Sequence, residues 1–291
     1  MKTPRFEYHA PRTLEEAVAL LGELGEEGKI LAGGQSLVPL LAMRLAQPAH
    51  LIDVNAIAEL GKIELRDGML VLGATVRHRQ AERSPLVRAE APLLADAFPF
   101  IGHVAIRTRG TVGGSISHAD ASAELPGIAR ALDAEMLVRS VRGDRVLKAA
   151  EFFSGHFTTG MDDDECLVEV RFPPWPQGAG WGLEEVVRRH GDFAVAGAGA
   201  MLALDGAGNI TEARVSLFGV ADTPVRASDA ESAVLGQAPS TAVFELAADA
   251  ATETLRPASD LHGSAAYRRQ VARVAVRRAL ATAATRMEER G

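Results

Sequence analysis

The sequence predicts a mixed α+β protein: two α/β subdomains, then a C-terminal part with a three-stranded antiparallel sheet and a helical bundle. Short apolar runs alternate with a helical pattern up to about residue 58. Hairpin patterns follow from Lys62, and the proline-rich residues 173–178 then interrupt regular structure. We therefore expect domains at 1–177 and 178–291, the first divided into subdomains at about 1–58 and 59–177.

The first subdomain is predicted from one amphipathic helix and two short strands. Thr13 and Glu16 have the spacing of a capping box, and apolar residues then recur at helical intervals. Residues 30–32 and 51–54 are apolar runs of strand length, and residues 37–45 between them have a helical pattern. This order of elements is typical of a small α/β unit.

The second subdomain is predicted to combine hairpins with helices. Asp67 and Gly68 stand between two apolar runs and favour a turn with positive φ angles. Pro92 either begins or kinks the helix that we expect around it, because proline cannot donate a helical hydrogen bond. The elements expected here are strands at 63–65, 69–72, 136–138, 145–147 and 167–172, and helices at 78–82, 86–98 and 122–134.

The C-terminal part is predicted to consist of three strands followed by helices. The expected strands are 181–189, 194–204 and 211–220, and the expected helices include 241–255 and 267–287. Arg269, Arg273 and Arg277 line one face of the last helix. We expect a solvated face or a protein contact there rather than a nucleic-acid site, because the chain as a whole is acidic.

Composition excludes several classes of function. The formal net charge of −7 argues against sequence-independent nucleic-acid binding, which needs a concentrated basic surface. The single cysteine, Cys166, cannot form an internal disulfide or hold zinc or an iron–sulfur cluster, and we expect it to be a small core residue. Without a signal-peptide pattern or an integral membrane segment, the expected location is cytoplasmic.

Two glycine-centred stretches carry the strongest functional signal. Residues 32–36 read Ala-Gly-Gly-Gln-Ser, and residues 111–120 begin Thr-Val-Gly-Gly-Ser. Paired glycines beside hydroxyl groups let backbone N–H groups approach a phosphate. A glycine pair alone is usually a turn, but the first stretch follows a strand and precedes a helix for which Ser36 is a plausible N-cap. We interpret the two stretches as halves of one diphosphate cradle.

Other motifs have simpler explanations. Gly197 and Gly199 begin a dinucleotide-like pattern, but Leu202 occupies the third glycine position, within an expected strand. His118 and Asp120 have no further clustered ligand, so we expect no metal site.

Two further residues leave alternatives open. Glu124 can complement a helix dipole or accept hydrogen bonds from a ribose. Phe193 can simply enter a strand or lie near a planar ring. The serines of the glycine stretches lack the G-x-S-x-G pattern of a hydrolase, so we assign no catalytic side chain.

These motifs together resemble the FAD-binding (medium) subunits of molybdenum hydroxylases, the family of aerobic carbon monoxide dehydrogenase and xanthine dehydrogenase. The resemblance rests on AGGQSL, RLAQPAHLIDVN, LGATV and RTRGTVGGSISHADASAELP, and extends to RRHGDFAVAGAGA and DLHGSAAYRRQVARVAVRRAL. It implies a PCMH-type FAD-binding fold for 1–177, with FAD held non-covalently between the two subdomains, and a carbon monoxide dehydrogenase flavoprotein-type domain for 178–291.

The resemblance also implies which residues bind the cofactor. These would be the pyrophosphate and flavin contacts Leu31, Ala32, Gly33, Gly34, Gln35, Ser36, Leu37, Thr111, Val112, Gly113, Gly114 and Ser115; the ribose and adenine contacts Ser117, His118, Asp120 and Glu124; the apolar walls Ile101, Ile106 and Leu167; and Asp192 and Phe193 near the flavin. Carbon monoxide dehydrogenases usually carry histidine at Gln35 and an acidic residue at Ser115, so carbon monoxide is not singled out as the substrate.

The implied function is electron transfer. In the family, a large molybdenum-pterin subunit oxidises the substrate, a small subunit carries two [2Fe-2S] clusters, and FAD passes the electrons to a final acceptor. We expect this chain to be the FAD subunit of such a heterotrimer, doubled to a dimer of heterotrimers. The alternatives are a stand-alone flavin oxidase of related fold and a structural subunit without cofactor.

Overall fold

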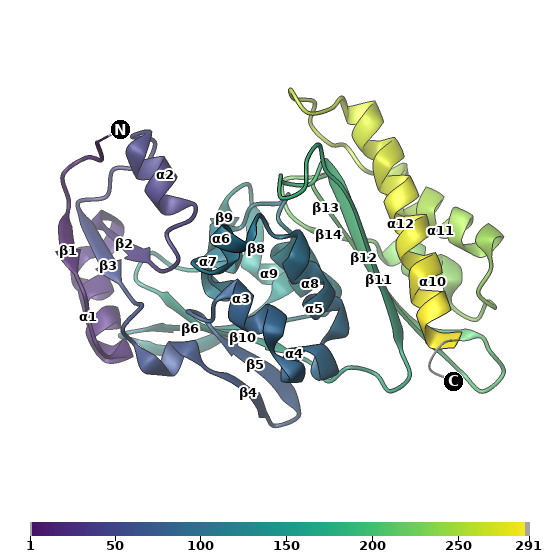
Figure 1. The fold of residues 1–291 in the computed structure, drawn as a ribbon, viewed down its shortest axis with the longest axis horizontal. Coiled ribbons are helices and arrows are strands. Elements are labelled where there is room, and N and C mark those ends of the chain that lie inside the picture. Colours follow the sequence, from purple (N-terminus) through teal and green to yellow (C-terminus); the bar gives the residue numbers. More distant parts are fainter. Residues whose placement is uncertain (1, 289–291) are drawn as a thin grey trace.

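The computed structural model describes residues 2–288, which form three units arranged along the long axis of the molecule (Figure 1). Each unit has its own main β-sheet. The chain begins in one end unit, passes through the middle unit and finishes in the other end unit, where the long C-terminal helix lies. Among residues 2–288, no helix is long and apolar enough to cross a bilayer.

The first unit is a three-stranded parallel sheet in the order β1-β3-β2. The Thr13 side chain caps α1 by accepting the N–H of Glu16 at 3.2 Å, and the Glu16 carboxylate accepts the N–H of Arg12 at 2.8 Å. The expected capping position is therefore confirmed. The elements are β1 (Glu7–His9), α1 (Leu14–Leu24), η1 (Gly25–Glu27), β2 (Gly28–Leu31), α2 (Leu37–Ala42) and β3 (His50–Asp53).

The middle unit contains a five-stranded antiparallel sheet in the order β4-β5-β10-β6-β7. Asp67 and Gly68 join β4 to β5 with φ angles of 52° and 78°, as the hairpin pattern predicted. The strands are β4 (Ile63–Arg66), β5 (Met69–Gly73), β6 (Glu135–Ser140), β7 (Gly143–Lys148) and β10 (Cys166–Phe172), with a small hairpin formed by β8 (Phe153–Gly155) and β9 (Thr158–Thr159).

Short helices cover one face of this sheet. The helix expected at 86–98 is divided at Ala91, and Pro92 begins the second helix, which is one of the two alternatives that the sequence left open. The first turn of a helix needs no N–H from proline. The helices are η2 (Ala58–Gly61), α3 (His78–Arg83), α4 (Pro85–Glu90), α5 (Pro92–Ala97), η3 (Phe98–Phe100), α6 (Val104–Arg107), α7 (Val112–His118), α8 (Glu124–Ala131) and α9 (Ala149–Phe152).

The first unit is joined to the middle unit through α1. Leu14, Ala17 and Leu21 of this helix share a buried apolar cluster with residues of β6 and β10, so α1 lies between the two sheets. Cys166 belongs to this cluster and is only 2% exposed. Burial raises the pKa of its thiol to about 12. Cys166 is therefore a core residue, as the sequence predicted.

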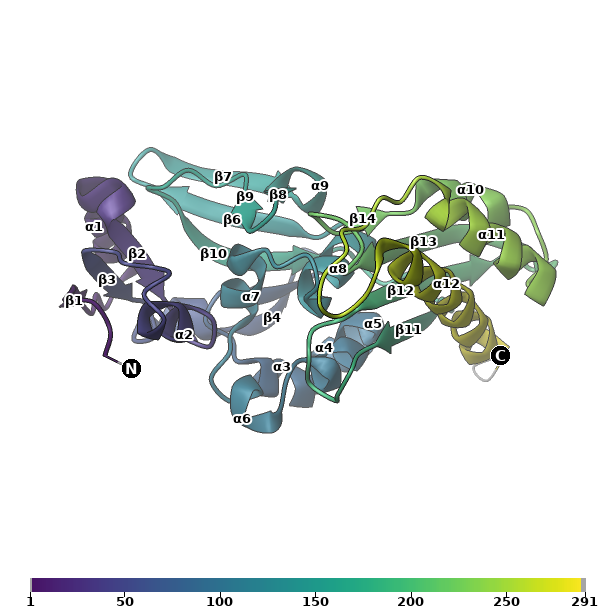
Figure 2. The ribbon, with the colours of Figure 1, turned by 90° about the horizontal axis from the view of Figure 1, so that it is seen from above.

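The C-terminal unit is a four-stranded antiparallel sheet covered by helices, with α12 lying across β11 and β12 (Figure 2). The fourth strand, β14, was not anticipated and is only two residues long. The elements are β11 (Gly180–Val186), β12 (Ala196–Leu204), β13 (Ile210–Phe218), β14 (Val225–Arg226), α10 (Ser228–Val234), α11 (Thr241–Glu253) and α12 (Ala265–Glu288).

Two glycines of β11 allow α12 to lie directly on the sheet. A Cβ on Gly180 would lie 1.9 Å from the carbonyl oxygen of Ala283, and one on Gly182 would lie 2.0 Å from that of Ala279. Arg286 of α12 then reaches the middle unit, where it donates to Asp96 of α5 at 2.6 Å. The indole of Trp181 donates to the same carboxylate at 2.9 Å, so this cluster joins the two units.

We expect Gly182→Val to destabilise the protein by about 3 kcal/mol, because the new side chain must displace the backbone of α12 rather than a flexible side chain. Urea denaturation measures the effect. Gly206→Val is the matched control, since no atom lies within 4 Å of its added Cβ. Equal stability of the two variants would contradict the close packing inferred here.

Candidate functional site

The two glycine stretches meet where the first and middle units adjoin. A Cβ on Gly33 would lie 2.5 Å from the carbonyl oxygen of Arg109 and 2.8 Å from the Cα of Gly110. A separation this short leaves no space for any side chain, so position 33 requires glycine. Segments 32–36 and 109–115 are therefore neighbours, as the interpretation of one shared cradle requires.

A chain of hydrogen bonds fixes this contact. The Asn55 amide donates to the carbonyl oxygen of Ala32 at 2.8 Å, and Arg77 donates to the Asn55 side-chain oxygen at 2.6 Å. Arg77 also donates to the carbonyl oxygen of Arg109. Sequence reasoning assigned no role to Asn55 or Arg77. The only available signal was their position just after apolar runs.

The first stretch leaves successive backbone donors unused. Gly34 has a φ of +71°, and the Gln35 side chain donates to the carbonyl oxygen of Gly33 at 3.2 Å, which holds the loop in shape. Ser36 precedes α2, but its side chain makes no capping hydrogen bond, contrary to expectation. Within residues 2–288, no protein group accepts the backbone N–H groups of residues 33–36.

The second stretch is not a bend but the start of α7. Thr111 caps this helix by accepting the N–H of Gly114 at 3.0 Å, while the N–H groups of Val112 and Gly113 donate to carbonyl oxygens of the neighbouring segment 74–76. The backbone N–H of Ser115 donates to the carbonyl oxygen of Thr111. The expectation that this stretch offers free amides is therefore wrong. Gly113 serves close packing instead, since its Cβ would lie 2.5 Å from that of Ala74.

A buried histidine supports the segment that enters α7. The Nε2 of His78 lies 2.8 Å from the carbonyl oxygen of Thr111, so Nε2 carries the proton. Burial lowers the pKa of His78 to about 4, which keeps the ring neutral near neutral pH. A Cβ on Gly110 would lie 2.9 Å from Nδ1, so this position also requires glycine.

The later part of α7 faces the first unit. Ser115, Ser117, His118 and Asp120 are half-buried. Burial and the nearby positive charge of Lys29 lower the pKa of His118, against the opposing effect of Asp120. Lys29 belongs to β2, and its charge acts on His118 at the end of α7. This end of α7 is therefore close to the N-terminal sheet.

The three expected apolar wall residues differ in their surroundings. Ile101 is partly buried, and buried Arg107 fixes its loop by donating to the carbonyl oxygens of Ile101 and Gly102 at 3.1 and 2.9 Å. Ile106, on α6, is partly exposed. Leu167 is only 5% exposed and packs inside the core of the middle unit.

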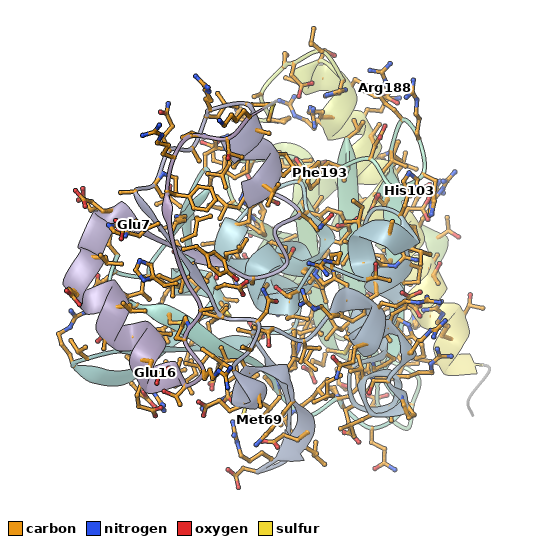
Figure 3. All side chains as sticks on the ribbon, turned by 60° about the vertical axis from the view of Figure 1, so that its left-hand side comes forward. Glu7, Glu16, Met69, His103, Arg188 and Phe193 are labelled. Carbon is orange, nitrogen blue, oxygen red and sulfur yellow. The ribbon has the colours of Figure 1, made fainter. Side chains whose placement is uncertain are left out.

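Asp192 and Phe193 lie on the loop between β11 and β12. A Cβ on Gly191 would lie 3.0 Å from the His103 ring and 3.1 Å from the backbone of Gly102, so this loop contacts the segment that carries Ile101. Phe193 is 59% exposed. Figure 3 shows Phe193 and His103 on the same side of the molecule, opposite Glu16 and Met69. The C-terminal unit thus contributes a loop beside the segment 101–103.

Glu124 is a buried carboxyl group at the first turn of α8. Only 4% of it is exposed, and burial raises its pKa to about 7. Burial raises the pKa of Glu185, on β11, to about 8, with the negative charge of Glu124 adding to the effect. One oxygen of Glu185 is buried without a hydrogen-bond partner. At neutral pH Glu185 is therefore mostly protonated and Glu124 partly so, which does not favour an exposed, fully charged role for Glu124.

A pocket of about 590 Å³ lies elsewhere, among α3, α4, α5 and Trp181. Its lining includes Arg79, Arg83, Arg88 and Asp96, and none of the predicted cofactor residues. The candidate site is therefore the junction of the glycine stretches, not this pocket.

Comparison with known families gives the class of the protein. Residues 4–175 match the family described as the FAD binding domain in molybdopterin dehydrogenase, and residues 181–283 match the CO dehydrogenase flavoprotein C-terminal domain. The chain belongs to the family of FAD-binding medium subunits of molybdenum hydroxylases, and is an oxidoreductase subunit.

Individual relatives cover nearly the whole chain. It is 41% identical to the carbon monoxide dehydrogenase medium chain of Hydrogenophaga pseudoflava, over 96% of this chain and 97% of that protein. It is 40% identical to the 6-hydroxypseudooxynicotine dehydrogenase complex subunit alpha of Paenarthrobacter nicotinovorans, over 97% of this chain and 96% of that protein.

Two solved structures share this fold. The carbon monoxide dehydrogenase structure from Hydrogenophaga pseudoflava matches with a TM-score of 0.96 and 42% identity, covering 98% of this chain and 99% of that one. Quinoline 2-oxidoreductase from Pseudomonas putida 86 matches with a TM-score of 0.94, 38% identity and the same coverage. These relatives are named for different substrates, so membership of the family does not specify one.

The carboxyl groups of Glu124 and Glu185 make stability depend on pH. Because their pKa values are raised in the folded state, the stability linked to their protonation is present below about pH 4.5 and is lost as pH rises through 7 to 8. Between pH 5 and pH 9, the free energy of unfolding of the Glu185→Gln variant should fall less than that of the unmodified chain. We expect a difference on the order of 2 kcal/mol. Denaturation curves across that range measure it.

Glu184→Gln is the matched control, since the neighbouring Glu184 forms an ion pair with Arg278 at 2.7 Å and its side chain is 28% exposed. Its pH dependence should follow that of the unmodified chain. Parallel curves for the Glu185→Gln variant and the unmodified chain would show that Glu185 is ionised throughout.

Proposed function

We propose that this chain is the FAD-carrying electron-transfer subunit of a cytoplasmic heterotrimeric molybdenum hydroxylase. Its partners are a large molybdenum-pterin subunit and a small subunit with [2Fe-2S] clusters, and the trimer is doubled to a dimer of heterotrimers. Family membership and the near-complete coverage of relatives named as subunits or medium chains support this proposal. The domains 1–177 and 178–291 would bind FAD and complete the site, respectively.

The single observation that carries the cofactor assignment is the loop 33–36. Its backbone N–H groups have no acceptor within residues 2–288, and Gly34 bends it with a positive φ. Successive free N–H groups in a bent loop are suited to an anion, and a diphosphate is the anion that FAD brings. FAD, when bound, accepts electrons and passes them to an acceptor.

The two stretches would have different roles toward FAD. Residues 33–36 would donate backbone N–H groups to the diphosphate, and Leu31, Ala32 and Leu37 would lie beside it. The stretch 111–115 would bring α7 close to the diphosphate and present the hydroxyl group of Ser115. Ser117, His118 and Asp120 would contact the ribose and adenine side. The proposed binding is non-covalent, and the single cysteine of the chain, Cys166, is buried and not among these contacts.

The flavin ring would lie toward the remaining residues. Ile101 and Ile106 would provide apolar contacts, with Leu167 supporting them from the core, and Asp192 and Phe193 would approach from the C-terminal unit. Glu124 would contribute to the site from its buried position in the first turn of α8. No acid, base or nucleophile is needed for electron transfer, so we assign no catalytic residue.

We expect Ser36→Asp to weaken FAD binding at least tenfold, because a carboxylate beside the free N–H groups repels a diphosphate. Flavin absorbance per chain and equilibrium titration with FAD measure the change. Ser232→Asp adds the same charge to α10 and should leave FAD binding unaltered. Circular dichroism of both variants checks the fold. Unchanged affinity in Ser36→Asp would overturn the role given to this loop.

We expect the native complex to contain this chain together with a large pterin-binding chain and a small cysteine-rich chain, in equal numbers and twice over. Native mass spectrometry of the complex purified from its source measures the stoichiometry. If the chain alone, without metal-containing partners, oxidised a small molecule, it would be a stand-alone flavin oxidase. A complex with intact metal centres that releases no flavin on denaturation would instead indicate a structural subunit without cofactor.

A further inference from the structure

A cluster of metal-ligating side chains lies in the first unit, apart from the proposed flavin site. Glu7 and His9 alternate along β1 and therefore lie on one face of the sheet. His50 of β3 is paired in register with Glu7, so its side chain lies on that face too. Together these residues form a group whose possible ligand atoms all lie within 4.8 Å of one another.

The distances fit a tetrahedral ion. Two ligand atoms bound to one tetrahedral zinc ion, each at about 2.0 to 2.1 Å, are separated by about 3.3 Å. The Nε2 of His9 lies 3.1 Å from the Nδ1 of His50, and a carboxylate oxygen of Glu7 lies 3.6 Å from that same Nδ1. Two of the three separations are therefore already close to the value that such an ion requires, and the third, between the Glu7 carboxylate and the His9 ring, is within 4.8 Å.

A second carboxylate lies behind the cluster. The other ring nitrogen of His50, Nε2, lies 4.0 Å from a carboxylate oxygen of Glu27. A metal-bound histidine commonly directs its second N–H toward a carboxylate, which orients the ring and strengthens the bond to the metal. Glu27 is placed for that role when His50 binds the metal through Nδ1.

The opposite face of the same sheet carries Tyr8 and Asp53, whose side chains form a hydrogen bond of 2.6 Å. Asp53 accepts from Asn55, which belongs to the contact between the glycine stretches. The cluster and the proposed flavin site are thus on opposite faces. In Figure 3, Glu7 lies near one end of α1, far from Phe193.

We propose that Glu7, His9 and His50 bind a divalent transition-metal ion of the zinc class, which joins the edge strand β1 to the central strand β3. Two imidazoles and one carboxylate are a known zinc ligand set, and the exposure of Glu7 leaves room for a water as the fourth ligand. Without metal, the two rings share one hydrogen bond. With metal, both of these nitrogens bind the ion, and the proton that lay between them moves to the other nitrogen of its own ring.

The test is titration of the untagged full chain with Zn²⁺, followed by calorimetry, and with Co²⁺, followed by visible absorption. We expect one ion per chain, a tetrahedral Co²⁺ spectrum and a higher melting temperature with Zn²⁺. Glu7→Gln should abolish stoichiometric binding, and because Glu7 is largely exposed this variant leaves the fold intact. Glu27→Gln should weaken binding about tenfold to a hundredfold.

His190→Ala is the matched control, because His103 and His190 form another histidine pair, with ring centroids 6.1 Å apart, but no third ligand group is found beside them among residues 2–288. This variant should still bind one ion. Absence of binding by the unmodified chain, or equal binding by the Glu7→Gln variant, would overturn the proposal. FAD content is expected to stay the same in the Glu7→Gln and Glu27→Gln variants, which separates this result from the proposed function.

Discussion

The contact of Gly33 with the Arg109–Gly110 backbone is the constraint on which the rest of the structure depends. It brings the loop that follows β2 and the segment that precedes α7 together without an intervening side chain. A contact between two backbones offers little apolar area, so it relies on hydrogen bonds through Asn55 and Arg77. The loop held in this way keeps its N–H groups free, which is the property that a diphosphate requires.

Binding and support are divided between the two sides of this junction. The first unit leaves backbone donors unpaired in residues 33–36, whereas the corresponding amides of α7 are all satisfied within the protein. His78 remains neutral and holds the entry to α7, so the helix is fixed before any ligand binds. The C-terminal unit adds the loop 191–193, whose position depends on its contact with His103.

The sequence predicted those parts that depend on neighbouring residues. The Thr13 cap, the Asp67-Gly68 turn and the proline-rich break after β10 each arise from local chemistry, and each is present. The nature of the second glycine stretch was not predictable, because glycines that relieve packing against Ala74 have the same pattern as glycines in a bend. Asn55 and Arg77 were missed because their partners lie far away in the sequence, and β14 because two residues carry no periodicity.

The seclusion of Cys166 has a practical consequence. A thiol that is inaccessible and protonated does not react with maleimides or nitroxide reagents while the chain stays folded. A second cysteine placed at a chosen surface position can therefore carry a fluorophore or spin label without removal of the natural one. With two such cysteines added, one in each of two units, the distance between those units becomes measurable in the otherwise unmodified polypeptide.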